Sequence, residues 1–505
     1  MLRRSLLTSA IAASLLTTFS LPAFATQVYE TDLVIIGGGL SGLAAAQSAV
    51  DQGAKPIVLE KEAALGGGGN FPEGSLGVGT RYQKEHNINT TVDQVLTAAL
   101  QYHHYRADPH VLRVLIEESG KTIDWVMDKG AQMRGIRTMY PKDESLMTWH
   151  LFKGGAAGII QRFAKEVRAK GGTILTETPA KKLIVENGKV VGVEAVDGEG
   201  EKVIVKAKKV IIATGGFESM LAKYVNDSSA LGMFEPVWYR GPVTDGKNGD
   251  GRTGDGIQMA QLVGAGVKGM HTIAGNAPYL ADLPPINQFM GADELKQGRC
   301  ALAQPWLWVD QHGKRFFNES RGAVFVDVYN AMTSAGGVMY NIIDQQKYDQ
   351  LVNKGALLPF NAIVLAGVPL KALPKTFEIG QQRGWAFKAD TIDDLAAQIG
   401  VPASNLKETM NKVNEYAKAG KDPEFGRLPE HLATFNMEKG PYYALKGIRA
   451  FFLTLGGVTV NPKFQALNPQ GDVIDNLYVV GQDIGGLYDS SYDLRCEGSA
   501  SSFAI

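Results

Sequence analysis

The segment from Thr31 to Lys61 constrains the fold more than any other part of this sequence. It reads as a buried strand (Leu33 to Ile36), a glycine turn, a helix and a second strand (Pro56 to Leu59) that leads into Glu60. The first strand is apolar without alternation, as is typical of a parallel strand buried on both faces. The order of these elements predicts a βαβ unit in a parallel sheet.

The glycine turn has the spacing G-x-G-x-x-G, formed by Gly37, Gly39 and Gly42. We expect the first glycine to permit the tight turn, the second to let the backbone approach a pyrophosphate, and the third to bring the helix close to the strand. Phosphates would bind at the helix N-terminus, where N–H groups are free and the helix dipole is positive. Glu60 is placed to accept hydrogen bonds from a ribose. The motif predicts a dinucleotide site, and the alternative is an ordinary glycine-rich turn.

The first 25 residues have the pattern of a secretory signal. Met1 to Ala25 has a basic start, an apolar middle and a small-x-small end, which predicts cleavage before Thr26. Arg3 and Arg4 fit either a twin-arginine or a Sec signal. No other segment is apolar over the length that a membrane helix needs. We therefore expect a soluble, periplasmic protein without a membrane span.

Length, charge and cysteine usage limit the remaining possibilities. The 505 residues suit two or three domains, and the net charge of -1 does not indicate a nucleic-acid partner. The two cysteines, Cys300 and Cys496, cannot form a C-x-x-C-H haem site, and we expect two unpaired buried thiols. His103, His104 and His150 lack carboxylate or cysteine partners at ligand spacing, so no metal site is predicted.

The pattern of the remaining chain predicts that it returns to the first sheet twice, the second time after an insertion. Helical periodicity covers Val92 to Gly130, and a further helix runs from about Lys153 to Lys170. A buried strand within Lys209 to Phe217 and another at Leu477 to Val480 both lead into glycine turns. A small meander is predicted from four short strands, Thr173 to Leu175, Lys181 to Glu186, Lys189 to Val196 and Lys202 to Val205.

These features suggest four segments. They are the signal (1–25), the first part of a dinucleotide-binding domain (26–268), an inserted capping domain (269–439) and the second part of the binding domain (440–505). The insertion is indicated where glycine turns give way to Pro-rich loops and helices, including Ile392 to Ile399 and Leu406 to Ala419.

With Ile35 to Gly42, Glu60, KVIIATGGF, TGDG and NLYVVGQDIGGLY in order, the chain resembles the FAD-binding family of fumarate reductase and succinate dehydrogenase flavoprotein subunits. Soluble flavocytochrome fumarate reductases, urocanate reductase and 3-ketosteroid dehydrogenases are similar. The resemblance implies an α/β fold: a Rossmann-like FAD-binding domain of parallel sheet plus β-meander, with an inserted α+β capping domain and catalysis between them. It also implies a further helix after Ile505, which would make this sequence a truncated one.

The resemblance implies FAD as the cofactor. The glycine-rich loop from Gly66 to Thr80 has no attachment histidine, so we expect noncovalent FAD. The residues predicted to contact it are Gly37, Gly39, Leu40, Ser41, Gly42, Glu60, Lys61, Gly67, Gly68, Ala180, Thr214, Gly215, Asp255, Gln482, Asp483 and Ser499.

The substrate side departs from the fumarate reductase pattern. The turn GKRFFNE (Gly313 to Glu319) matches the family's G-x-R-F-x-N-E, but the arginine that serves as the acid four residues later is Ala323 here. The position of a carboxylate-binding histidine is Leu453. Arg495 in SYDLRCEGSASSF does match the family's carboxylate-binding arginine. We therefore expect a substrate other than fumarate.

The predicted catalytic residues are Arg495, Tyr492, Tyr488, Arg321 and Arg299. An arginine offers two-point binding to a carboxylate, and the tyrosines could donate a proton or hydrogen-bond a carbonyl. The alternatives are a structural ion pair for Arg495, ordinary packing for the tyrosines, and surface positions for the other two arginines.

Three functions fit these residues. The first is a reductase of an unsaturated organic acid, with electrons from a separate cytochrome c or quinol-linked partner. The second is a dehydrogenase of a ketone-bearing, 3-ketosteroid-like substrate. The third is a flavin-binding electron-transfer protein without small-molecule catalysis.

Overall fold

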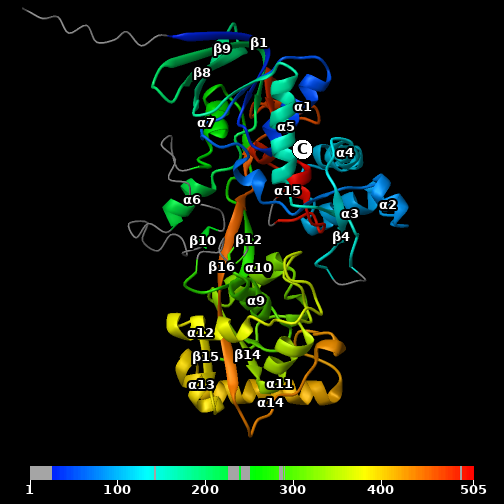
Figure 1. Ribbon diagram of the computed structural model, residues 1–505, viewed down its shortest axis with the longest axis vertical. Helices are drawn as coiled ribbons and strands as arrows, with labels where there is room; N and C mark the ends of the chain where they lie inside the picture. Colours follow the sequence, from blue (N-terminus) through cyan, green and yellow to red (C-terminus); the bar gives the residue numbers. More distant parts are fainter. Residues whose placement is uncertain are drawn as a thin grey trace, which may run out of the picture.

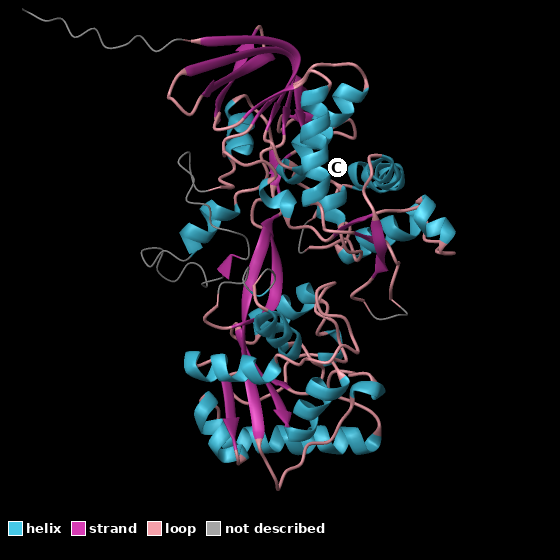
Figure 2. Cartoon of the chain, viewed as in Figure 1, coloured by secondary structure: helices cyan, strands magenta, loops and turns pink. Residues whose placement is uncertain are grey.

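The computed structural model describes residues 26–140, 144–225, 238–239, 251–283, 288, 291–488 and 492–505. The predicted signal at residues 1–25 and residues 284–287 of a predicted Pro-rich loop lie outside the described residues. The molecule is elongated, with a large sheet toward each end and helices around both (Figures 1 and 2).

The first βαβ unit is confirmed. β1 (Gln27–Ile36), α1 (Leu40–Asp51) and β2 (Ile57–Leu59) follow in order, and β1 pairs with β2 in parallel. Gly37 has φ +110, and a Cβ there would lie 2.2 Å from the carbonyl oxygen of Ala213. Only glycine therefore fits where the strand turns into the helix.

The first sheet has eight strands in the order β18-β19-β9-β1-β2-β6, with β8 attached to β9 and β7 attached to β8. The pairs from β19 to β6 along this order are parallel, and the remaining pairs are antiparallel. This arrangement confirms the predicted α/β class. The further strands are β6 (Thr173–Leu175), β7 (Ala180–Glu186), β8 (Lys189–Val196), β9 (Lys202–Ile212), β18 (Gln465–Leu467) and β19 (Val473–Val479).

The prediction of a four-stranded meander is wrong in two respects. β6 pairs in parallel with β2, so it belongs to the parallel part of the sheet. The strand predicted to end at Val205 and the strand predicted to begin at Lys209 are one continuous strand, β9, which pairs with β1 along its length. Lys208 and Lys209 interrupt the apolar pattern at its middle, which makes one strand read as two.

Several helices begin where a polar side chain accepts hydrogen bonds from free backbone N–H groups. Thr80 and Thr91 form capping boxes at the starts of α2 and α3, and Asp108 caps α4. α5 packs on α1, and α3 and α4 lie beside a small sheet in which β5 pairs with β3 and β4 (Figure 1). These elements are α2 (Arg81–Glu85), α3 (Val92–Tyr102), α4 (Pro109–Asp128), α5 (Ala157–Ala169), β3 (Gly74–Leu76), β4 (Met133–Arg137) and β5 (Trp149–Phe152).

The second large sheet is built around the long strand β16 (Tyr442–Thr454), which runs from the middle of the molecule into its lower end (Figure 1). β12, β14 and β15 pair antiparallel with β16, β10 pairs parallel with it, and β13 pairs with β14. These strands are β10 (Trp238–Tyr239), β12 (Ile273–Leu280), β13 (Trp308–Val309), β14 (Val338–Asp344) and β15 (Ala386–Ala389).

Helices surround this second sheet and bury a large apolar core with it. Trp308 and Trp385 are among its largest fully buried side chains. The predicted helix Ile392 to Ile399 is confirmed as α13, and the one predicted from Leu406 begins three residues earlier as α14. The helices are α9 (Asp293–Leu302), α10 (Phe325–Ser334), α11 (Gln345–Asp349), α12 (Leu373–Arg383), α13 (Ile392–Ile399) and α14 (Ala403–Ala419).

The predicted segment boundaries at residues 268/269 and 439/440 remain predictions. The sheets divide the chain differently at the second of them, because β16 lies after residue 440 and yet pairs with strands of the predicted capping domain. The chain returns to the first sheet at β18 and β19. Within the described part of the chain, no helix is long and apolar enough to cross a membrane.

Candidate active site

The residues predicted to bind the cofactor gather where the parallel strands of the first sheet end. β1 leads into Gly37, β2 into Glu60, β9 into Thr214, and β19 into the short helix η5 (Gly481–Asp483). The carboxyl ends of neighbouring parallel strands meet at one edge of a sheet, where α/β proteins bind their ligands. Segments far apart in the sequence therefore come together at this edge.

Glu60 is buried at the end of β2. Its carboxylate oxygens accept hydrogen bonds from the backbone N–H groups of Gly38, at 2.6 Å, and Glu62, at 2.8 Å. Burial raises the pKa of this carboxyl above its ordinary value, although the two backbone hydrogen bonds act in the opposite direction. Glu60 thus holds the glycine turn as well as standing at the predicted ribose position. The backbone N–H of Thr178 donates to the Glu60 carbonyl oxygen at 2.8 Å, which brings the start of β7 at Ala180 close by.

The Asp483 carboxylate holds two further predicted positions. One carboxylate oxygen accepts from the Thr214 hydroxyl at 2.7 Å and the other from the Gly215 N–H at 2.6 Å. Burial raises the pKa of Asp483 to about 7 against the effect of these bonds. The preceding residue, Gln482, donates to the Thr454 carbonyl oxygen at 3.0 Å, and so connects η5 to the end of β16.

The remaining predicted cofactor residues lie around the same edge. Lys61 forms an ion pair of 2.8 Å with Asp255, the first residue of α7 (Asp255–Leu262). Leu40 and Ser41 begin α1, and a Cβ on Gly481 would lie 2.1 Å from the Ser41 hydroxyl oxygen. Gly67 and Gly68 lie in the glycine-rich loop, and Ser499 begins α15 (Ser499–Ser502).

An apolar pocket lies between the end of β16, η5 and α15. It is lined by Leu453, Thr454, Leu455, Gly481, Gln482, Ile484, Leu487, Tyr488, Ala500 and Phe503. A Cβ added to Gly39 on the glycine turn would meet no atom closer than 3.8 Å, and one added to Gly67 in the glycine-rich loop would meet nothing within 4 Å. The turn therefore leaves room for a pyrophosphate, and the pocket presents a mainly apolar lining at the same edge of the sheet. These residues fit FAD.

Arg321 and Arg495 come together on one carboxylate, that of Glu144. Arg321 Nη1 lies 2.6 Å from Glu144 Oε1, and Arg495 Nη2 lies 2.8 Å from Glu144 Oε2. Arg321 Nε also contacts Asp327 at 2.6 Å. Arg321 is half-buried, with a side chain that is 23 % exposed. For Arg495 the ion pair of the structural alternative is present, and its partner Glu144 has a side chain that is 29 % exposed.

Burial lowers the pKa of Arg321, but its hydrogen bond to Glu144 and the charge of Asp327 outweigh that effect and raise the pKa above its ordinary value. Arg321 is therefore a stable cation in this arrangement. It is suited to holding an anion, whereas releasing a proton would require the two carboxylates to withdraw.

Tyr140 lies beneath the two guanidinium groups. Its ring centroid is 4.5 Å from the Arg495 guanidinium carbon and 6.0 Å from that of Arg321. Its hydroxyl donates to Asp493 at 3.0 Å. Glu497 accepts hydrogen bonds from the Thr138 hydroxyl at 3.0 Å and from the backbone N–H of Met139. The C-terminal loop therefore fixes the chain segment that leads to Glu144.

Tyr488 and Tyr492 are buried side by side, with ring centroids 5.5 Å apart. The Tyr488 hydroxyl donates to the Ser499 hydroxyl oxygen at 2.9 Å. The Tyr492 ring packs against Phe325 and Phe452. Burial raises the pKa of both phenols, so both stay protonated. Both tyrosines are packed in the interior, as the alternative of ordinary packing predicts. Tyr488 also lines the apolar pocket.

Arg299 lies apart from these residues. It is in α9 and is 3 % exposed, so the alternative of a surface position is wrong. Its guanidinium carbon lies 5.1 Å from the Tyr279 ring centroid and 4.8 Å from that of Phe360, both in the core of the second sheet. The structure does not bring Arg299 to the carboxylate that Arg321 and Arg495 share.

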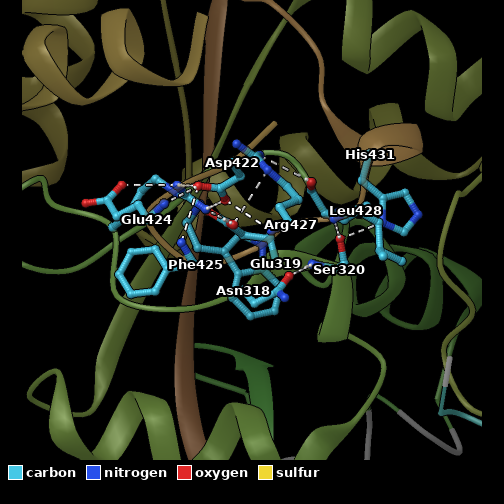
Figure 3. A network of polar contacts seen from close by, with 12 residues as sticks. Asn318, Glu319, Ser320, Asp422, Glu424, Phe425, Arg427, Leu428 and His431 are labelled. Atoms are coloured by element: carbon cyan, nitrogen blue, oxygen red, sulfur yellow. Dashed lines mark hydrogen bonds and ion pairs between the residues drawn. The ribbon is translucent and has the colours of Figure 1, made fainter. Parts of the chain in front are cut away.

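A buried polar network holds the turn that carries Arg321 (Figure 3). Arg315 contacts Glu319 at 2.6 Å and Asp422 at 2.7 Å, with side chains that are 1 % exposed or less. Burial alone would raise the pKa of Asp422, but Arg315 lowers it to about 2. Ser320 accepts a hydrogen bond from the Leu428 N–H at 2.9 Å. This network connects the turn to the 422–428 loop and so positions Arg321.

Sequence reasoning missed Glu144, Asp327, Tyr140 and Asp493. Glu144 follows a stretch without periodicity or motif, and its partners lie 177 and 351 positions away, so no local signal marks it. Asp327 lies six positions after Arg321. An acidic residue so close to a candidate arginine was one available hint, and Asp493, two positions before Arg495, offered the same hint.

The two cysteines are both free and buried, as predicted. Burial raises the pKa of the Cys300 thiol to about 12. Among the residues that the structure describes, no group of three or more His, Cys, Asp or Glu side chains could hold a metal ion.

The fold and the cofactor edge define an FAD-dependent oxidoreductase, and comparison with known proteins agrees. The family described as FAD binding domain matches residues 32–498, and the chain belongs to this family. It binds FAD, and its relatives are reductases and dehydrogenases that act on C=C or CH–CH bonds.

Two relatives and one solved structure illustrate the similarity. The chain is 29 % identical to vinyl phenol reductase of Lactiplantibacillus plantarum, over 94 % of each chain. It is 26 % identical to NADH:fumarate oxidoreductase of Klebsiella pneumoniae, where 90 % of this chain spans 45 % of the relative. The structure of 3-ketosteroid-Δ4-(5α)-dehydrogenase from Rhodococcus jostii RHA1 has a TM-score of 0.70 at 21 % identity, over 94 % of this chain and 95 % of that one. This last likeness shows the fold.

Proposed function

We propose that this enzyme reduces the C=C bond of an unsaturated organic acid other than fumarate. The observation that supports the proposal is the convergence of Arg321 and Arg495 on the carboxylate of Glu144. Two guanidinium groups from distant parts of the chain thus hold one carboxylate, and a substrate carboxylate that replaced Glu144 would meet the same two groups. Phe325 is in ring contact with Tyr492, Tyr492 with Tyr488, and Tyr488 lines the apolar pocket.

In such a reduction, bound FAD supplies hydride chemistry, so that one alkene carbon gains a hydride and the other a proton. The residues of this chain have to orient the alkene and draw electron density from it. Arg321 and Arg495 would do both by holding the substrate carboxylate. Tyr488 and Tyr492 are the candidate proton donors, because Tyr488 lines the apolar pocket and the Tyr492 ring lies against that of Tyr488.

Fumarate itself is a poor candidate. Ala323 cannot transfer a proton, and Leu453, which lines the apolar pocket, cannot hydrogen-bond a second carboxylate. Loss of a catalytic proton donor typically lowers rates by ~10²–10⁴. We therefore propose an acid with an apolar group in place of the second carboxylate.

A second candidate is a neutral alkene that carries a phenol or ketone. It is favoured by Glu144, which already neutralises the two arginines, and by the apolar lining around Leu453 and Tyr488. The similarity to a vinyl phenol reductase over nearly the whole of both chains also supports it. A buried, protonated tyrosine could hydrogen-bond a phenol or carbonyl oxygen.

We further propose that the protein is exported to the periplasm and receives electrons from a separate cytochrome c or quinol-linked partner. The pattern of Met1 to Ala25 supports export, and the lack of a C-x-x-C-H motif supports a separate haem protein. Expression of the full sequence should place the protein in the osmotic-shock fraction, with Thr26 at its N-terminus. Retention of Met1 in a cytoplasmic protein would exclude this part of the proposal.

The function is tested with a panel of electron acceptors. The purified protein is reduced with dithionite-reduced methyl viologen, and reoxidation is followed with cinnamate, acrylate, fumarate, 4-vinylphenol and an enone steroid. We expect cinnamate or acrylate to reoxidise the viologen much faster than fumarate does. Fast turnover of 4-vinylphenol or the steroid without turnover of any acid would favour the second candidate. A failure of all five acceptors would contradict both.

A further inference from the structure

Glu144 occupies the position in which the proposed function places a substrate carboxylate. One oxygen is held by Arg321 at 2.6 Å and the other by Arg495 at 2.8 Å. Arg495 Nη1 also donates to the Glu144 backbone carbonyl oxygen at 3.0 Å. One side chain of the protein therefore makes the two-point contacts that an acid would make.

The charges around the two arginines are balanced. The two positive charges of Arg321 and Arg495 face the negative charges of Glu144 and Asp327, which contacts Arg321 at 2.6 Å. The nearby Asp493, which accepts a hydrogen bond from the Tyr140 hydroxyl, is an acid and cannot add positive charge to the cluster. While Glu144 is in place, an acid that approaches this cluster meets no net positive charge and gains no electrostatic attraction. The binding of a neutral substrate does not depend on such attraction.

The Glu144 contacts are also exchangeable. The side chains of Glu144, Arg321 and Arg495 are 29 %, 23 % and 24 % exposed, so water and solutes reach the cluster. The structural network of Arg315 and Glu319 in the same chain is different, because its side chains are 1 % and 0 % exposed. Partly exposed ion pairs contribute little to stability, so displacing Glu144 would cost little.

We propose that Glu144 determines the charge of the substrate that this active site accepts. Its carboxylate competes with a substrate carboxylate for Arg321 and Arg495, and it thereby weakens the binding of acids relative to neutral alkenes. This inference rests on the proposed function only in placing the arginine pair beside the substrate. Removal of the carboxylate should therefore shift specificity toward acids.

The test compares wild type with Glu144→Gln and Glu144→Ala. The substrates are cinnamate and cinnamamide, which differ mainly in charge, and reduction is followed with reduced viologen. We expect KM for cinnamate to fall by about threefold or more in both variants, because the acid then no longer has to displace the Glu144 carboxylate from two partly exposed ion pairs. KM for cinnamamide should change little. Glu118→Gln removes a carboxylate that is 54 % exposed on α4, and it serves as the control for net charge.

A binding measurement accompanies the kinetics. The visible spectrum of the oxidised protein is titrated with 3-phenylpropionate, which has no C=C bond to reduce, and the dissociation constant should fall in both Glu144 variants. Equal or weaker binding of acids in both variants would overturn the proposal, and a lower melting temperature beside it would make Glu144 a structural link. If Arg495→Lys also leaves acid kinetics and binding unchanged, the proposed function itself fails, which separates the two outcomes.

Discussion

At the scale of single residues, Arg495 has the most constrained position among the candidates. Its backbone has φ +62, a region that side-chain-bearing residues seldom adopt, and its neighbours on both sides are buried. Strained backbone of this kind persists only where the surroundings hold it, and it occurs often at functional sites. The conformation directs the guanidinium over Tyr140 and onto Glu144.

Replacing Arg495 with lysine should leave the fold and FAD in place but lose two-point binding of a carboxylate. Loss of one partner of a hydrogen-bonded charge pair usually costs about 2–5 kcal/mol, so turnover of an acid should fall steeply. Kinetics on an acid from the panel and the flavin spectrum measure the two effects. Arg113→Lys, on the exposed face of α4, is the matched control. If Tyr488→Phe and Tyr492→Phe are more damaging than Arg495→Lys, the substrate is a neutral phenol or ketone.

Asp493 should make stability depend on pH. Burial, with the charge of Glu497, raises its pKa from 3.8 to about 7. Between these values the folded state holds a proton that the unfolded state has released, so this group's contribution to stability falls as pH rises toward 7. From pH 5 to pH 8 the loss from this group is about 2–3 kcal/mol.

Asp493→Asn removes that loss and keeps an oxygen that can accept from Tyr140. The free energy of unfolding, measured by urea denaturation at both pH values, should therefore fall less with pH in the variant than in wild type. Asp128→Asn, at a carboxylate that is 64 % exposed, should behave as wild type does. Parallel pH curves for wild type and Asp493→Asn would contradict the assignment.

At the scale of elements, the turn between β1 and α1 controls the cofactor site. A Cβ on Gly42 would lie 1.9 Å from the carbonyl oxygen of Gly37, well inside any tolerated contact. The third glycine of the motif is thus needed for close packing of the helix against the turn. The side chain added by a substitution would push the N-terminus of α1 away from the position where the phosphates bind.

Gly42→Ala should therefore weaken FAD binding more than it weakens the fold. We expect purified Gly42→Ala to contain much less flavin than wild type, as measured by the ratio of absorbance at 450 and 280 nm, with near-normal far-ultraviolet circular dichroism. Gly158→Ala is the control, because a Cβ there meets nothing within 4 Å and α5 gains a better helix former. Full flavin content in Gly42→Ala would show that the helix can shift without loss of the site.

At the scale of the whole molecule, the candidate site depends on both large sheets being joined correctly. Arg321 and Asp327 belong to the part of the chain around the second sheet, while Glu144 and Arg495 come from segments beside the first. β16 begins in the second sheet and ends at Thr454, where Gln482 of the first sheet's edge contacts it. Relative movement of the two parts would therefore separate Arg321 from Glu144 and Arg495.

FAD should be released by denaturation, because the glycine-rich loop from Gly66 to Thr80 offers no histidine for covalent attachment. Precipitation of the purified protein with trichloroacetic acid should leave a yellow supernatant and a colourless pellet. The supernatant should contain FAD by chromatography, in about equimolar amount with the protein. Yellow colour that stays with the pellet would contradict noncovalent binding.

Much of the local structure could be predicted because it depends on short-range periodicity. The βαβ unit has its apolar spacing and turn glycines within a few residues, and α13 and the two helices between Val92 and Gly130 have their apolar spacing and caps there. The meander was misread at β6 and β9, because which strand a short apolar segment pairs with depends on distant partners. Which strands become neighbours in a sheet is decided by the tertiary structure.

The sequence was sufficient to identify the cofactor edge, because the glycines of a dinucleotide turn are required by backbone sterics and lie close together in the chain. It also identified Arg321 and Arg495 as candidates. Their meeting on Glu144, and the position of Arg299 in a different core, followed only from the folded chain. An ion pair joins side chains that pack together in space, and contacts across 177 or 351 positions leave no periodic trace in the sequence.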